Sequence, residues 1–169
     1  MTAPDGKDTR PTSDRVRESM FNALQSMGVI EGATVLDLFA GSGALGIEAL
    51  SRGAEHATFV ESDRRALAAI GSNLDRTRLA EKATVTATDV GPFVASGRAG
   101  RGFDLVLADP PYSFDGWDVL LAGLELGAVV VVESGRAIVP PPPWSAIRQK
   151  RYGGTWVTIC AAVAPERLP

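Results

Sequence analysis

The strongest constraint on this sequence is an alternation of short apolar runs with segments whose apolar residues recur every three or four positions. The first kind predicts β-strands and the second predicts helices. The expected strands are 34–39, 56–61, 83–87, 103–108 and 128–132, and the expected helices between them are 44–52, 64–79, 90–96 and 115–124. Such alternation predicts an α/β fold with a mostly parallel sheet covered on both faces, because each crossover helix must pack on one face.

Two further predictions concern the ends of this alternating region. Before it, Thr12 and Ser13 are good N-cap residues for an amphipathic helix with apolar positions between 16 and 27. After it, the proline run 140–143 is a stiff connection, and the segments 145–152 and 155–163 flank the two-residue turn signal Gly153-Gly154. We therefore expect a C-terminal antiparallel hairpin at the edge of the sheet.

Composition excludes several classes of protein. The 169 residues are 45% hydrophobic and 22% charged, which suits one globular domain with a real core. Cys160 is the only cysteine and His56 the only histidine, so a disulfide framework and a cysteine/histidine zinc cluster are excluded. Hydrolytic triads are nearly excluded, because His56 would have to be their only base. No metal site is expected.

The N-terminal sequence and the charge bear on location and partners. The first 14 residues contain no apolar signal region, so we expect an intracellular, cytoplasmic protein without a membrane segment. The net charge of −3 argues weakly against a general polyanion binder. A local basic patch remains open, and the candidates for it are Arg148, Lys150 and Arg151 together with Arg10, Arg15 and Arg17.

A glycine-rich segment lies where it would form a nucleoside-binding loop. Residues 41–46, GSGALG, match G-x-G-x-x-G between an expected strand and an expected helix. Such glycines permit a tight turn, close approach of a ligand to the backbone, and close packing of helix on strand. Glu61 ends the next strand, placed to accept hydrogen bonds from ribose hydroxyls. The pattern predicts a nucleoside-containing cofactor at Gly41, Ser42, Gly43 and Glu61, and a purely structural glycine turn is the alternative.

Two aspartates refine this prediction. Asp37 lies at the carboxyl end of the first strand, where an ionised carboxylate would repel the pyrophosphate of a dinucleotide and attract a cationic cofactor. S-adenosylmethionine (SAM) fits, since it carries an ammonium and a sulfonium and no phosphate. Asp37 could instead brace the loop or cap a helix. Asp89 follows the third strand and could accept a hydrogen bond from adenine or cap the next helix; both interpretations stay open.

The tetrapeptide Asp109-Pro110-Pro111-Tyr112 follows the fourth expected strand, beside the glycine loop. Two prolines stiffen the chain and remove two amide donors, so the loop presents acceptors to a ligand. Asp109 and the Pro110 carbonyl could accept both hydrogens of a planar amine, and Tyr112 offers a face for a nucleobase. The alternative is a proline turn with an ordinary aromatic anchor.

Four segments in this order resemble the bacterial small-subunit ribosomal RNA guanine-N2 methyltransferase family: RPTSDRVRESMF (10–21), VLDLFAGSGALGIEALSRGA (35–54), FVESD (59–63) and LVLADPPY (105–112). The resemblance covers residues 10–162 and implies a seven-stranded Rossmann-like, SAM-dependent methyltransferase domain over 10–169, preceded by a short flexible segment, 1–9. It implies methyl transfer to the exocyclic N2 of one guanine in 16S rRNA, on naked RNA or on the assembling small subunit, by a protein we expect to be a monomer.

By position, the resemblance assigns the residues named above. Asp37, Gly41, Ser42 and Gly43 would contact the amino-acid part of SAM, with Glu61 at its ribose and Asp89 at its adenine. The segment 109–112 would hold the target base, and Arg10, Thr12 and Arg15 would bind RNA. Three rivals remain: an adenine-N6 or other amino methyltransferase, an NAD(P)-dependent oxidoreductase, and a non-catalytic RNA-binding relative.

Overall fold

The computed structural model describes residues 14–162. The expected segment 1–9 and the predicted RNA-binding residues Arg10 and Thr12 lie outside this range. In chain order, the described helices and strands are α1 (Asp14–Ser26), β1 (Thr34–Leu38), α2 (Ala44–Ser51), β2 (His56–Glu61), α3 (Arg64–Thr77), β3 (Ala83–Ala87), α4 (Val90–Ala95), β4 (Leu105–Ala108), α5 (Trp117–Ala122), β5 (Val129–Ser134), β6 (Trp144–Tyr152) and β7 (Thr155–Ala162), with short 3-10 turns at Ala80–Lys82 and Arg98–Gly100.

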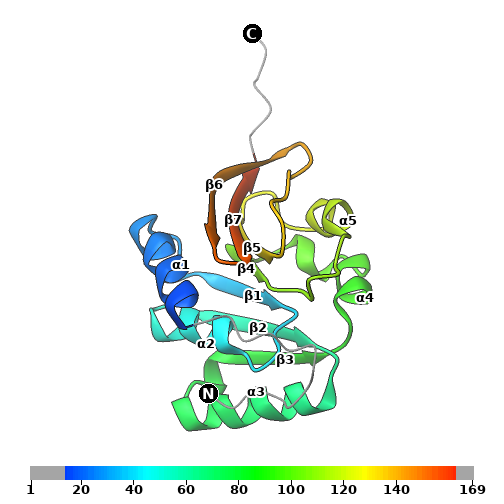
Figure 1. Ribbon diagram of the computed structural model, residues 1–169. Helices are drawn as coiled ribbons and strands as arrows, with labels where there is room; N and C mark the ends of the chain where they lie inside the picture. Colours follow the sequence, from blue (N-terminus) through cyan, green and yellow to red (C-terminus); the bar gives the residue numbers. More distant parts are fainter. Residues whose placement is uncertain (1–13, 163–169) are drawn as a thin grey trace.

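The strands form one seven-stranded sheet in the order β3-β2-β1-β4-β5-β7-β6 (Figure 1). Every pair from β3 to β5 is parallel, while β7 runs antiparallel to both β5 and β6. The predicted α/β fold, with a mostly parallel sheet and a C-terminal antiparallel hairpin, is confirmed. Because β7 alone is reversed in this sheet, β6 points in the same direction as β5.

Helices cover both faces of the sheet. Residues of α1, α2 and α3 pack with Val35, Phe59 and Leu107 on one face. Residues of α4 and α5 pack with Leu36 and Val130 on the other. Alternate residues of each central strand enter the two layers, as the two-residue period of a strand requires. The layers bury β1 and β4 on both sides and leave only the strand ends for polar side chains.

Most of the helices and strands differ from their expected bounds by one or two residues, and two of these differences lie beside acidic residues. The fourth strand begins at Leu105 rather than at 103, and just before it the Asp104 side chain accepts a hydrogen bond from the Thr34 amide. The fifth strand runs to Ser134 rather than ending at 132. It therefore includes Glu133, which is only 1% exposed. The sequence predicted that β5 ends before the charged Glu133, but Glu133 is part of β5 and is buried.

Residues 14–162 contain neither a membrane-spanning helix nor a metal-binding cluster. No helix there is both long and apolar enough to cross a membrane. Within the same residues, no group of three histidine, cysteine or acidic side chains is arranged to hold a metal ion.

Candidate functional site

The carboxyl ends of the parallel strands bring four acidic residues to one edge of the sheet. Asp37 belongs to β1, Asp109 follows β4, Glu133 belongs to β5 and Glu61 ends β2. Asp109, Glu61 and Glu133 all act electrostatically on Asp37. Val35, Leu107 and Val131, two positions before Asp37, Asp109 and Glu133, lie in the α1–α3 layer, so strand alternation puts these three acids on that face.

Asp37 holds the beginning of α2. It is 1% exposed, and its Oδ2 accepts a hydrogen bond of 2.9 Å from the Gly46 amide. Gly46 is the third residue of α2, and the N-cap residue Gly43 has no side chain to bind that amide. Asp37 thus supplies from β1 the contact that an N-cap side chain normally makes. The loop-bracing alternative is therefore part of what this residue does.

Burial raises the pKa of the Asp37 carboxyl well above its ordinary value of 3.8, because removal from water disfavours the charged form. The hydrogen bond from Gly46 lowers this pKa, and the negative charges of Asp109, Glu61 and Glu133 raise it further. A cation bound here would favour ionisation and reduce the repulsion among these acids. The electrostatics of the edge thus suit a positively charged ligand.

The three glycines of the loop serve the purposes expected from the pattern. Gly41 and Gly43 have φ angles of 57° and 81°, in the left-handed region that favours glycine. Gly46 permits close packing, since a Cβ there would lie 2.3 Å from the Phe59 ring and 3.0 Å from Asp37 Oδ2. Phe39 also has a positive φ, 58°, which side chains rarely adopt and which often accompanies functional loops.

Further hydrogen bonds fix the outer part of the loop. Glu61 Oε2 accepts from the Gly41 amide at 2.8 Å, while Oε1 accepts from the amides of Ser62 and Asp63 at 3.0 Å each. Each carboxylate oxygen has two lone pairs, so Glu61 retains acceptor capacity for a hydroxyl. The Ser42 carbonyl accepts from Asn73 Nδ2 of α3 at 2.9 Å. The loop is thus fixed by its neighbours on β2 and α3.

Asp89 occupies the N-cap position of α4, but its side chain makes no capping hydrogen bond. The residue is exposed. Of the two interpretations that the sequence left open, the helix-capping one is therefore wrong as far as the side chain is concerned. The carboxylate stays a candidate contact for a ligand beyond the end of β3.

The Asp109–Tyr112 segment forms a rigid corner directly after β4. Pro110 is buried, Pro111 is exposed, and the Pro111 carbonyl accepts a hydrogen bond of 2.9 Å from the Phe114 amide. The Phe114 ring packs edge-on against the Phe39 ring, with 5.3 Å between centroids. This contact joins the corner to the glycine loop, so the two motifs are held together.

Tyr112 is held by two segments far away in the sequence. Its ring lies against Gly135, where an added Cβ would come within 2.6 Å of the ring. Its hydroxyl lies 3.2 Å from Thr155 Oγ1 and 3.5 Å from the Gly154 carbonyl, at the turn between β6 and β7. The side chain is still 50% exposed. Tyr112 is therefore an oriented aromatic group with surface left to contact a ligand.

Sequence reasoning missed three residues of this edge. Glu133, Gly135 and Asn73 carry no motif, and their roles come from contacts with distant segments. A signal existed for Glu133 alone, since it follows an apolar run in register with the acid after β4. The remaining predicted residue, Arg15, lies on α1, where it is exposed.

Comparisons with known proteins agree on one group of relatives. The family model described as conserved hypothetical protein 95 matches residues 1–161. The putative rRNA methyltransferase YlbH of Bacillus subtilis is 38% identical over 164 residues, which covers 91% of this chain and 88% of that protein. Ribosomal RNA small subunit methyltransferase D of Escherichia coli is 39% identical over 167 residues, covering 90% and 79%. The solved structure of a putative methyltransferase, yhhF from Escherichia coli, superposes with a TM-score of 0.80 at 36% identity, covering 94% of this chain and 90% of that one.

Proposed function

This chain belongs to the family described as conserved hypothetical protein 95, and from that membership we propose that it is a SAM-dependent ribosomal RNA methyltransferase. We further propose that it methylates the exocyclic N2 of a guanine in 16S rRNA, as a methyltransferase of the kind that modifies guanine 966. The observation that carries the proposal is the joining of two motifs: a glycine loop lined by acids, and the Asp109–Tyr112 corner packed against it through Phe39 and Phe114.

The chemistry of the loop fits SAM. Asp37 would face the cationic amino-acid part together with Gly41, Ser42 and Gly43, where the nearby acids Asp109, Glu61 and Glu133 would also attract a positive charge. The Glu61 oxygens can accept from ribose hydroxyls, and Asp89 from the adenine amine. When bound, SAM supplies an electrophilic methyl group on a sulfonium sulfur. The same acids would repel a pyrophosphate, which disfavours an NAD(P)-dependent oxidoreductase.

The corner would hold the acceptor base. Asp109 and the Pro110 carbonyl would accept the two hydrogens of the guanine amine and direct its nitrogen lone pair. Transfer of the methyl group would form the bond from nitrogen to carbon as the bond from carbon to sulfur breaks and leaves a neutral thioether. The Asp109 carboxylate would stabilise the positive charge on the nitrogen until its proton is released to solvent. Pro111 stiffens the segment and Tyr112 stacks on the base. A paired guanine is out of reach, so the base must be unpaired or flipped out.

The remaining parts of the proposal concern the extent of the domain, its oligomeric state, its location and its contacts with RNA. Residues 10–169 would form one methyltransferase domain that acts as a monomer on 16S rRNA or on the assembling small subunit. We place the protein in the cytoplasm, where that substrate is found. Arg15 would contact the RNA, together with Arg10 and Thr12.

The decisive experiment uses small ribosomal subunits from cells that lack the corresponding methyl group, purified protein and isotope-labelled SAM. We expect label in 16S rRNA, located by nuclease digestion and mass spectrometry to N2 of a single guanine. Label on adenine N6 or in DNA would show an amino methyltransferase with another acceptor. RNA binding without label, with SAM bound, would identify a non-catalytic relative and overturn the proposed reaction.

A further inference from the structure

The edge strand β6 contains one extra residue in its pairing with β7. Ala146 pairs with Cys160 and Arg148 pairs with the next residue, Ile159, so Ile147 is a β-bulge with no partner of its own. Ile147 is 52% exposed. A bulge changes which face of the sheet the following side chains occupy, because strand side chains alternate with a period of two.

The bulge turns a basic stretch of β6 toward α1. Before it, Ala146 is opposite Cys160, which belongs to the α4–α5 layer. After it, Arg148 is opposite Ile159 and Lys150 opposite Val157, both in the α1–α3 layer. If Ile147 had instead paired regularly with Ile159, Arg148 would lie opposite Thr158, and the even-numbered positions would have continued on the α4–α5 face.

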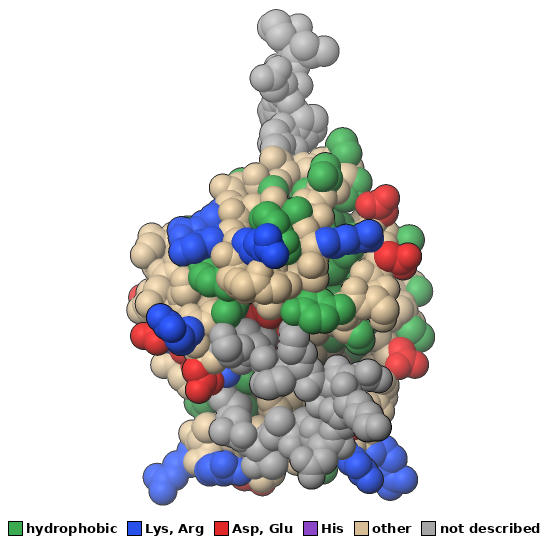
Figure 2. Space-filling model, in the orientation of Figure 1, with side chains coloured by type: hydrophobic (Ala, Val, Ile, Leu, Met, Phe, Trp, Pro, Cys, Tyr) green, Lys and Arg blue, Asp and Glu red, His purple; other side chains and the backbone are tan. Residues whose placement is uncertain are grey.

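Part of this stretch of β6 forms one wall of a groove of about 620 Å³. Arg148 and Tyr152 line it from β6, and Arg15, Ser19 and Asn22 are among the residues that line it from α1. Lys150 lies beside it, next to Arg148 and Tyr152 in a smaller adjoining pocket and with its ammonium 4.9 Å from the centre of the Tyr152 ring. In Figure 2, basic side chains lie over the region of β6 and α1.

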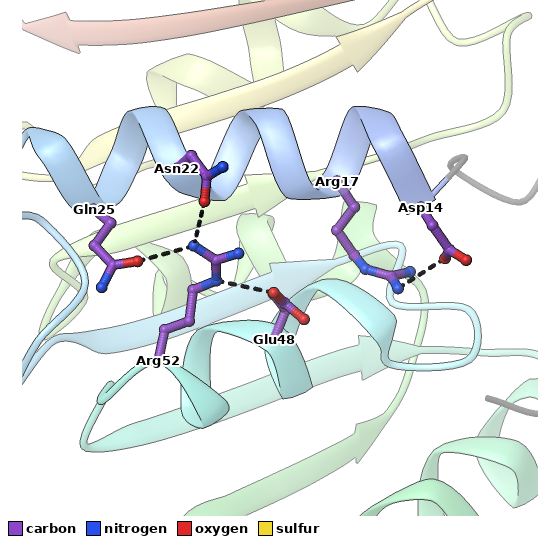
Figure 3. A network of polar contacts seen from close by, with 6 residues as sticks. All are labelled: Asp14, Arg17, Asn22, Gln25, Glu48 and Arg52. Carbon is purple, nitrogen blue, oxygen red and sulfur yellow. Dashed lines mark hydrogen bonds and ion pairs between the residues drawn. The ribbon is translucent and has the colours of Figure 1, made fainter.

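The α1 wall is fixed in place. Arg52, just after α2, donates from Nη1 to Asn22 Oδ1 and Gln25 Oε1 and from Nε to Glu48 Oε1, each at 2.9 Å (Figure 3). Across the groove, Ser19 Oγ and the Tyr152 hydroxyl are 2.7 Å apart. The two walls are therefore held at a defined separation, as a binding site requires.

The Tyr152 end of the groove lies near the Asp109–Tyr112 corner. Tyr152 is the last residue of β6, and the chain then turns through Gly153 and Gly154. The Gly154 carbonyl and the Thr155 hydroxyl are the groups that lie at the Tyr112 hydroxyl. A chain bound in the groove could thus continue to the position assigned to the target base.

The charge of the groove favours a polyanion. Arg15, Arg148 and Lys150 face it or adjoin it, and among the described residues Glu18 is the one acid that lines it. Two other members of the basic patch expected from the sequence lie elsewhere: Arg17 is paired with Asp14, and Arg151 lies over Trp156. Resting on the proposed function, we propose that the α1–β6 groove binds the phosphate backbone of the RNA substrate next to the flipped-out base.

A different explanation of the basic residues must be separated from this one. Lysine and arginine on an edge strand also prevent pairing with strands of other molecules. That role would need no contribution from Arg15, which belongs to a helix on the opposite wall. A site for RNA needs both walls, so variants of the two walls should affect the same property.

The test compares Arg15→Ala, Arg148→Ala and their double variant with Arg101→Ala, an exposed arginine that precedes β4, at the edge where the parallel strands begin. Binding of a fluorescent single-stranded RNA is measured by anisotropy over a range of salt concentrations. We expect the double variant to bind about tenfold more weakly, with the salt slope reduced by about 0.7–0.9 for each phosphate that is no longer neutralised. Arg101→Ala should match the wild type.

Methyl transfer to small subunits and SAM binding complete the test. The groove variants should raise the KM for the subunits with kcat and SAM affinity unchanged. Equal RNA affinity and salt slope in the double variant and in Arg101→Ala would overturn the groove assignment, as would aggregation of the groove variants without weaker RNA binding. If the wild type binds RNA through the groove but transfers no methyl group, the proposed function fails and the groove assignment stands.

Discussion

The glycine loop and the Asp109–Tyr112 corner lie at the same edge of the sheet but are held in different ways. The loop is fixed mainly by hydrogen bonds to backbone amides and carbonyls, from Asp37, Glu61 and Asn73. The corner is fixed by two prolines and by packing of rings, with Phe114 on Phe39 and Tyr112 on Gly135.

This difference suits two different tasks. Hydrogen bonds to backbone groups position individual polar atoms, as is needed for a small cofactor of fixed shape. Ring packing orients a flat surface and leaves it half exposed, as is needed to admit and release a base of a large substrate. Substitutions in the first region should therefore change cofactor affinity and stability, and substitutions in the second should change transfer.

The largest effect is expected from Asp109→Ala. Removal of the charge beside the amine nitrogen should lower kcat about 10²–10³-fold, with SAM affinity nearly unchanged. Turnover of labelled SAM on small subunits and calorimetry with SAM measure the two quantities. Asp118→Ala, on the exposed side of α5, is the control and should retain both. A parallel loss of SAM binding would place Asp109 in the cofactor region instead.

Asp37→Asn tests whether the charge of Asp37 contributes to SAM binding. The amide oxygen can still accept from Gly46, but the negative charge is gone, so the Kd for SAM should rise about ten- to hundredfold. Thermal stability of the protein without SAM should not fall. A less stable variant with unchanged SAM affinity would mean that Asp37 only braces the loop.

The pH dependence of stability gives a second readout for Asp37. Because its pKa is raised in the folded protein, the folded state keeps the proton above pH 3.8 while the unfolded chain has released it. Stability contributed by this group is therefore full below pH 3.8 and is lost as pH rises through the folded-state pKa. Denaturant titrations should show this fall in the wild type and not in Asp37→Asn. Identical pH profiles would contradict the raised pKa.

Gly46→Ala tests the packing beneath the loop. The added methyl group collides with the Phe59 ring, so the free energy of unfolding should fall by about 1–3 kcal/mol. Gly71→Ala is a matched control in α3, where nothing lies within 4 Å of the added carbon. That variant should gain about 0.5–1 kcal/mol through helix propensity. Equal denaturation midpoints for the two variants would show that α2 can move away from β2.

The smallest effect is expected from Gly135→Ala. The methyl group displaces the Tyr112 ring, which should raise the KM for small subunits about three- to tenfold, part of the value of a base stack. Stability should change little, and Gly91→Ala, with open space around it, should leave the KM for small subunits unchanged. An unchanged KM would show that Gly135 is not needed to position the Tyr112 ring.

The sequence predicted the fold well where local patterns decide it. The strands 56–61 and 83–87 and the turn at Gly153-Gly154 have their expected bounds, because apolar runs there are bordered by turn or cap residues such as Asp63. The predicted end of β5 at residue 132 was wrong, because the burial of Glu133 depends on neighbouring strands. The bulge at Ile147 could not be predicted, because register is set by the partner strand.

The candidate site was predicted in part. The motif residues do meet at one edge, since the carboxyl ends of parallel strands must. The contacts of each residue were harder to predict from the sequence. Asp37 accepts a hydrogen bond from the Gly46 amide, and the Asp89 side chain makes no capping hydrogen bond. Gly135 and Asn73 act through segments that meet only after folding, and no local pattern marks such residues.

The bulge in β6 also bears on how this surface can change over evolutionary time. Replacement of Arg148 or Lys150 alters the charge of the groove one residue at a time, and each intermediate protein keeps its architecture. Deletion of the single codon for Ile147 would remove only the bulge, because Arg148 would then follow Ala146 directly and still lie opposite Ile159. Both kinds of mutation leave positions 150 and 152 opposite Val157 and Thr155, so the α1-facing surface tolerates loss of the extra residue as well as substitution.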